Sequence, residues 1–155
     1  MTDIYESENY EISYRAVKQA KKNLRLYTDK DEIEIEGEIS FDIDARARSS
    51  MDYFAASVMG GLVCHIMDSA HRKNILLEDI EGKLKLNLKN PLTVLGVKGY
   101  DEFPYIESCE AVIYVYSDIG EKELYAFLDD SLKSCFIYQT LERALKISVR
   151  FVLTL

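Results

Sequence analysis

The 155-residue sequence contains only two prolines and seven glycines, and no segment is rich in either. A linker between domains usually needs such a segment, so its absence favours a single domain over residues 1–155. The length suits one domain. With 48% hydrophobic and 30% charged residues, the composition is that of a globular chain. Only residues 1–8 are predicted to form a loose N-terminus.

The chain also lacks a long apolar run and an excess of positive charge. No stretch approaches the ~20 apolar residues that span a bilayer, and the acidic start of the chain does not resemble a signal peptide. The formal net charge is −8, which argues against a nucleic-acid partner and leaves no basis for a membrane partner. The short basic run from Lys18 to Arg25 is followed at once by acidic residues, so we interpret it as a solvated strand or turn.

Residues that carry reactive groups are few. The chain has three cysteines, an odd number, and no recognisable secretion signal. This combination favours a reducing cytoplasm in which the thiols are free. His65 and His71 are six residues apart and do not share a helix face, so no metal site is predicted. No glycine-rich phosphate loop, nucleophile elbow or HExxH motif is present, and no cofactor is predicted.

Alternating apolar residues predict strands early in the chain, most clearly over residues 32–44. A helix is predicted over 51–73, with Ser49 and Ser50 as N-cap candidates. Between residues 53 and 67 this helix is apolar nearly all round, which predicts burial in the core or at a subunit interface. The other predicted elements are strands 10–17, 23–28, 75–88, 107–116 and 147–155, a loop at 91–104, and helices 120–132 and 136–145. Strands and helices are segregated, which favours the α+β class.

Two segments of this order resemble the OsmC/Ohr family of peroxide-reducing proteins. The run Ser-Ser-Met-Asp-Tyr-Phe-Ala-Ala at 49–56, continuing to Met-Gly-Gly at 59–61, is similar to the family's entry into its central helix. The run Leu-Lys-Ser-Cys-Phe-Ile-Tyr-Gln-Thr-Leu at 132–141 is similar to the family's C-P-V-x-x-T-L turn between two short helices. The resemblance implies antiparallel sheets around a long buried central helix, in an intertwined homodimer.

The resemblance also implies a thiol peroxidase site. Family members reduce organic hydroperoxides with a pair of cysteines, and a dithiol reductant then reopens the disulfide. Cys135 matches the resolving cysteine, although Phe136 replaces the usual proline. Asp52 matches the carboxylate that orients an activating arginine, for which Arg46 is our candidate. The alternative interpretation of Asp52 is an acid favoured by the helix dipole. Other candidates for the activating arginine are Arg15, Arg25 and Arg48.

The sequence departs from the family at the nucleophile, which lies ten residues after the acid. Ten residues after Asp52 is Leu62, and the nearest thiol, Cys64, is two residues further on. Two helical residues correspond to about 200° of rotation, so a regular helix turns Cys64 away from the direction of Leu62. An irregularity of the helix at Gly60 and Gly61 would turn the Cys64 side chain back toward that direction. Without one, Cys64 is interpreted as a buried structural thiol. Cys109, on the apolar face of a strand, is interpreted as core.

Three functions follow as hypotheses. The first is a peroxidase with Cys64 as nucleophile, Cys135 as resolving thiol, and Arg46 with Asp52 as the activating pair. The second is a non-catalytic family member that keeps an apolar cleft for a small ligand. The third is an unrelated α+β interaction module. Peroxide-driven disulfide formation between the two cysteines separates the first hypothesis from the second.

Overall fold

The structure is a computed structural model that describes residues 11–39, 44 and 48–154. The chain divides into two compact units, Met1–Tyr53 and Phe54–Leu155. The prediction of a loose N-terminus at 1–8 falls outside the described residues, and the single domain over 1–155 stays a prediction.

The first unit contains a three-stranded antiparallel sheet. Its strands are β1 (Arg15–Val17), β2 (Leu24–Tyr27) and β3 (Glu32–Ile35), which pair in chain order. Along β3 the isoleucines are half-buried and the glutamates are exposed, as the alternating pattern predicts. The strand ends at Ile35, earlier than the predicted 32–44, and residues 40–43 are outside the described part.

Backbone hydrogen bonds in the first unit join the segment after β3 to the start of the long helix α2 (Ser50–Arg72). The backbone N–H of Glu36 donates to Arg48, and that of Ser50 donates to Gly37 at 3.0 Å. The hydroxyl of Tyr53 donates to the carbonyl of Glu34 at 2.6 Å. These bonds anchor the first turn of α2 to the β3 side of the unit.

The second unit contains a mixed three-stranded sheet, β4 (Asp79–Lys89), β5 (Tyr105–Tyr116) and β6 (Lys146–Thr154), in that order. β4 and β5 are antiparallel, whereas β5 and β6 are parallel. The parallel pair is a feature that the expectation of antiparallel sheets did not include. It arises because α4 (Glu121–Lys133) and α5 (Phe136–Ala144) form the crossover between the two strands, a connection that parallel strands require.

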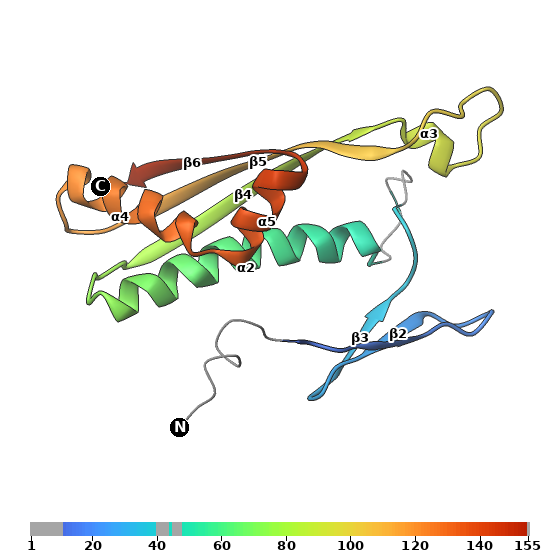
Figure 1. Cartoon of the computed structure of the whole chain (residues 1–155), viewed down its shortest axis with the longest axis horizontal. Coiled ribbons are helices and arrows are strands. Elements are labelled where there is room, and N and C mark those ends of the chain that lie inside the picture. Colours follow the sequence, from blue (N-terminus) through green and yellow to red (C-terminus); the bar gives the residue numbers. More distant parts are fainter. Residues whose placement is uncertain (1–10, 40–43, 45–47, 155) are drawn as a thin grey trace. The chain divides into compact units, whose positions relative to one another are not determined.

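One face of this sheet carries the core. The inward residues of β5, which include Cys109 and Ile113, are fully buried, and they pack in one cluster with Leu62 and Ile66 of α2 and Leu128 of α4. The three helices therefore cover the same face of the sheet (Figure 1). The β4–β5 hairpin continues beyond them and carries the short helix α3 (Pro91–Val94) at its far end (Figure 1).

The second unit matches the predicted order of elements, with two differences. The predicted loop at 91–104 contains α3, a single turn that begins at Pro91, and the predicted strand from residue 75 begins only at Asp79. In addition, α2 is less buried in this single chain than its apolar sequence indicates. Its buried residues are Val58, Leu62, Ile66, Ser69 and Ala70.

Candidate functional site

The start of α2 is closed by a reciprocal capping arrangement between Ser49 and Asp52. The Asp52 Oδ2 atom accepts hydrogen bonds from the Ser49 backbone N–H and hydroxyl, each at 2.8 Å. The Asp52 N–H in turn lies 3.2 Å from the Ser49 hydroxyl oxygen. The hydrogen bonds that Asp52 accepts hold the pKa of its carboxyl below the ordinary value, and the bond from the Ser49 backbone N–H has the larger effect. Ser49 is thus the N-cap, and Asp52 occupies the position of the acid in a capping box.

The candidate arginines lie in the first unit, and two of them have side-chain partners there. The guanidinium of Arg15 stacks on the Tyr27 ring at 4.8 Å, and that of Arg25 lies 3.7 Å from the Glu32 carboxylate. The Arg48 backbone N–H donates to the Glu36 side chain at 2.8 Å. Arg46 lies outside the described residues, so its pairing with Asp52 stays a prediction.

The middle of α2 meets the turn between α4 and α5 at Gly61. A Cβ atom on Gly61 would lie 2.5 Å from Cγ1 of Ile137, closer than real carbon contacts allow. Glycine therefore permits the close approach of α5 at this point. Outside the neighbouring backbone of α2, no atom of the described residues lies within 4 Å of the equivalent position on Gly60.

The same turn brings Cys135 onto α2. The Cys135 Sγ lies 3.9 Å from the carbonyl oxygen of Gly61, and its side chain is 2% exposed. Cys135 is also the N-cap residue of α5, with an extended backbone (φ −87°, ψ 117°).

The other two cysteines differ in environment. Cys109 is fully buried in β5, and this burial raises the pKa of its thiol. The negative charge of Glu110 raises that pKa further. It is the core residue that was predicted. Cys64 is exposed, which corrects the interpretation of a buried structural thiol. The reason is geometric, because α2 is a regular helix through both glycines and Leu62 takes the fully buried direction.

In a regular α2, Cys64 nevertheless lies close to Gly61, the residue of this helix that Cys135 contacts. Cys64 follows Gly61 by three residues, and residues three apart are neighbours on a helix surface, with Cβ atoms about 5–6 Å apart. Helical side chains lean toward the N-terminus, so the Cys64 side chain covers the turn that contains Gly61. Leu62, Phe54 and Met59 belong to the apolar cluster on this part of the helix.

A polar contact that the sequence did not indicate joins α2 to the same turn. The Nε2 atom of His65 lies 3.0 Å from the Ser134 hydroxyl and 3.4 Å from that of Ser69. The spacing of the two histidines carries information only about a shared metal site, so it does not indicate a histidine that pairs with a serine 69 residues later. Across residues 11–39, 44 and 48–154, no group of three or more His, Cys, Asp or Glu side chains is arranged to hold a metal ion.

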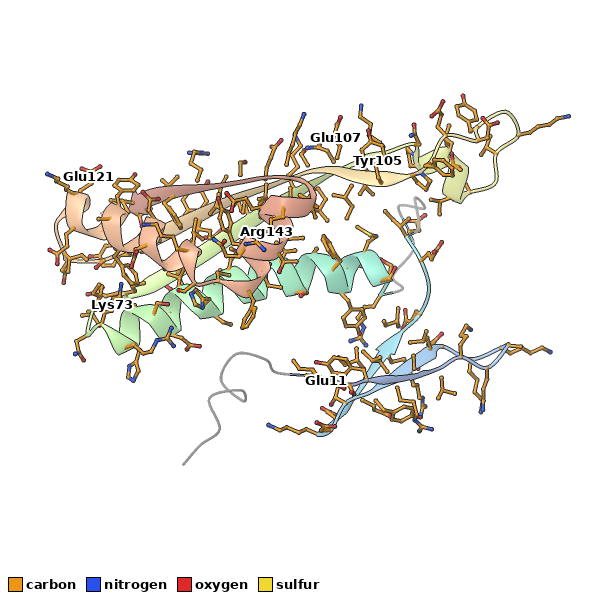
Figure 2. All side chains as sticks on the ribbon, in the orientation of Figure 1. Glu11, Lys73, Tyr105, Glu107, Glu121 and Arg143 are labelled. Atoms are coloured by element: carbon orange, nitrogen blue, oxygen red, sulfur yellow. The ribbon has the colours of Figure 1, made fainter. Side chains whose placement is uncertain are left out.

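The described side chains of the second unit are drawn in Figure 2, where Lys73 directly follows the end of α2 and Tyr105 begins β5. Among the described helices, none combines the length and apolar character needed to cross a membrane.

Residues 43–150 match a protein family described as OsmC-like protein. The sequence matches no curated protein. Among solved structures, an OsmC-like protein from Mycoplasma pneumoniae is 16% identical, with 95% of this chain and 99% of that chain covered and a TM-score of 0.73. An organic hydroperoxide resistance protein OsmC from Legionella pneumophila is 13% identical over 94% and 98% of the two chains, with a TM-score of 0.65.

The organic hydroperoxide resistance protein OhrB of Bacillus subtilis is 11% identical over 92% of this chain and 98% of that chain, with a TM-score of 0.62. At such identities the similarity establishes the fold alone, whereas the family match spans most of the sequence. The matched region begins before α2 and ends in β6, so it includes both motif segments on which the resemblance was based. The chain therefore belongs to the OsmC-like protein family, as a member with low sequence identity to the solved structures that it resembles.

Proposed function

We propose that this protein reduces organic hydroperoxides with a pair of thiols, Cys64 as the nucleophile and Cys135 as the resolving cysteine. The observation that carries the proposal is the 3.9 Å contact between Cys135 Sγ and the carbonyl of Gly61, one helical turn from the exposed Cys64. Relatives that share the fold are described as organic hydroperoxide resistance proteins. The substrate class of the proposal comes from these relatives.

The reaction proceeds in three balanced steps. The Cys64 thiolate attacks the peroxide, so that an S–O bond forms and the O–O bond breaks. The leaving alkoxide takes up the proton that the thiol released on ionisation and departs as the alcohol. The resulting sulfenic acid condenses with the Cys135 thiol, which gives a disulfide and releases water. A dithiol reductant then exchanges with this disulfide, restores both thiols and is itself oxidised to a disulfide.

The activating groups are proposed from the resemblance. The positive charge of Arg46 would stabilise the negative charge of the nucleophilic sulfur, and Asp52 would orient the Arg46 guanidinium. Asp52 already accepts two hydrogen bonds through Oδ2, and a carboxylate has further acceptor sites on its second oxygen. The capping role and the orienting role are therefore chemically compatible.

The proposal includes a homodimer in a reducing compartment, the cytoplasm. Cys64, Cys109 and Cys135 are all free thiols, a state that a reducing environment maintains. A partner subunit over the exposed flank of α2, which includes Ala56, Gly60 and Cys64, would supply the apolar cover that the sequence of residues 53–67 predicts. No nucleic-acid or metal partner is part of the proposal.

A second candidate function is a non-catalytic dimer that binds a small apolar ligand. The observation that favours it is Leu62, which is fully buried at the position ten residues after Asp52, where the family carries its nucleophile. In this alternative the buried leucine replaces the reactive thiol, and Cys64 has no redox role.

Mass spectrometry after one equivalent of cumene hydroperoxide tests the proposal. We expect a loss of two hydrogens that maps to a Cys64–Cys135 disulfide, while the peptide that contains Cys109 stays unchanged and serves as the internal control. In the Cys135→Ser variant we expect Cys64 to gain one oxygen instead, because no resolving thiol remains. Unchanged thiols at Cys64 and Cys135 would favour the non-catalytic alternative.

A further inference from the structure

The thiol of Cys135 is buried, and this burial depends on how the turn between α4 and α5 is held on α2. The turn consists of Ser134 and Cys135, between the end of α4 and the start of α5. Cys135 is 2% exposed, although Phe136 next to it is 90% exposed. A small opening of the turn would therefore bring the sulfur to the surface.

Three contacts hold the turn on α2, and they differ in strength. The Cys135 Sγ faces the Gly61 carbonyl at 3.9 Å, which is a weak interaction because a thiol is a poor donor. Ile137 packs on Gly61 through apolar contact. The His65–Ser134 contact at 3.0 Å is the strong polar one of the three, since it joins an imidazole nitrogen to a hydroxyl at a normal hydrogen-bond distance.

His65 is itself held in place from α2. Its Nε2 atom lies 3.4 Å from the Ser69 hydroxyl, one helical turn later, and the Ser69 hydroxyl accepts a hydrogen bond from Arg72 Nη2 at 3.1 Å. The imidazole is thus positioned by its own helix and directed at the turn. On the other side, the Ser134 hydroxyl also lies 3.3 Å from the Ser131 carbonyl in the last turn of α4.

We propose that His65 is a positioning residue for Cys135: its hydrogen bond to Ser134 keeps the turn closed on α2 and so controls when the Cys135 thiol can react. The functional meaning of this control rests on the proposed role of Cys135 as the resolving thiol. A closed turn keeps Cys135 beside α2 for the condensation with Cys64, and it shields the thiol from other reagents between reaction cycles.

The rate at which N-ethylmaleimide alkylates Cys135, followed by mass spectrometry of its peptide, tests the proposal without any peroxide. Alkylation of a buried thiol requires a local opening, so its rate reports how often the turn leaves α2. We expect His65→Ala and Ser134→Ala each to raise the rate about fivefold, the effect of losing one hydrogen bond of about 1 kcal/mol. The double variant should be no faster than the faster of the two single variants, because both substitutions remove the His65–Ser134 contact.

Two internal controls make the result decisive. Cys109 is fully buried in β5, so its alkylation reports global unfolding and should stay slow in every variant. His65→Gln keeps a side chain that can reach Ser134 and should restore most of the slow rate. An unchanged Cys135 rate in both single variants, additive effects in the double variant, or equal acceleration of Cys109 would overturn the proposal.

The peroxide experiment is separate from this one, so the two proposals fail independently. If cumene hydroperoxide leaves the thiols unchanged while His65→Ala still accelerates alkylation of Cys135 alone, the closed turn stands and the peroxidase does not. If the disulfide forms and alkylation is unaffected, the peroxidase stands and the role of His65 does not.

Discussion

The adjacent glycines Gly60 and Gly61 have the same helical context but different surroundings. A methyl group on Gly61 would collide with Ile137, whereas a methyl group on Gly60 would meet no atom within 4 Å. Since both substitutions by alanine improve helix propensity by about 1 kcal/mol, the difference between them isolates the packing of α5 on α2.

We predict that Gly61→Ala destabilises the protein and that Gly60→Ala does not. The collision should cost about 1–3 kcal/mol, typical of overpacking, and outweigh the gain in propensity. Urea unfolding of the two variants and the parent measures the free energies of unfolding. A Gly61→Ala variant as stable as Gly60→Ala would show that α5 does not pack on α2 at this point.

Asp52 gives a prediction about pH. Its hydrogen bonds from Ser49 lower the pKa of the folded state below the ordinary value of 3.8. A lowered folded pKa means that the stabilisation is complete above the ordinary value and is lost as the pH falls through the folded pKa. We therefore expect Asp52→Asn to lower the melting temperature at pH 7.

That deficit should shrink as the pH falls below about 4, because the parent carboxyl then becomes protonated as well. Thermal unfolding by circular dichroism over this pH range provides the measurement, and Asp129→Asn, on the exposed side of α4, is the matched surface control. A deficit that is the same at pH 7 and at low pH would contradict the charged capping arrangement.

At the scale of the element, α2 presents two candidate positions for a nucleophile. Leu62 is fully buried, and Cys64 lies on the exposed flank beside Gly61. The resemblance implies that a sulfur at residue 62 faces the resolving cysteine. The regular helix implies that a sulfur at residue 64 covers the turn that Cys135 touches.

We predict that Cys64→Ser abolishes formation of the peroxide-driven disulfide and that adding Leu62→Cys in that background restores it. The readout is the loss of two hydrogens on the peptide pair that contains Cys135. Leu62→Ala in the same background controls for the cavity, which should cost about 2–5 kcal/mol in stability without restoring the reaction. A disulfide that persists in the Cys64→Ser variant would exclude Cys64 as the nucleophile.

The elements themselves were largely predictable, and the failures have physical causes. Helical and strand periodicities located α2, α4, α5 and β5 within a few residues, because each has an apolar face against the core. The single turn of α3 has no such face, and the parallel pairing of β5 with β6 is a non-local choice that no local pattern encodes.

The candidate site was predictable only in part for the same reason. The position of Cys135 at the start of α5 followed from a motif, and its contact with Gly61 required the packing of two distant segments. The exposure of Cys64 was missed because a helix that is apolar all round does not reveal which face meets the core within a single chain. The His65–Ser134 bond connects residues 69 positions apart, and neither residue type signals it.

At the scale of the whole molecule, the second unit exposes apolar side chains that a folded chain usually covers. They gather in and after α3, at the far end of the β4–β5 hairpin, and we term them the hairpin-tip patch: Leu92, Val94, Leu95, Val97, Tyr100, Phe103 and Tyr105. Phe103 is 88% exposed. Scattered apolar residues on a surface are normal, but seven within one hairpin tip are typical of an interaction surface.

We predict that the protein is a homodimer in solution and that the hairpin-tip patch contributes to its interface. Burying one phenylalanine contributes about 1.5–3 kcal/mol, so Phe103→Ser should raise the dimer dissociation constant at least about tenfold. Sedimentation velocity over a range of concentrations measures this constant. Lys83→Ser, an exposed change on the outer face of the sheet, is the matched control and should leave it unchanged.

The homodimer and the role of the hairpin-tip patch can be contradicted independently. A parent protein that sediments as a monomer at all concentrations would contradict the homodimer. A dimer that Phe103→Ser leaves intact would confine the interface to other surfaces, such as the exposed flank of α2 around Cys64. In that case, Cys64 should be alkylated more slowly as the protein concentration rises, because the partner subunit would cover it in the dimer and expose it in the monomer.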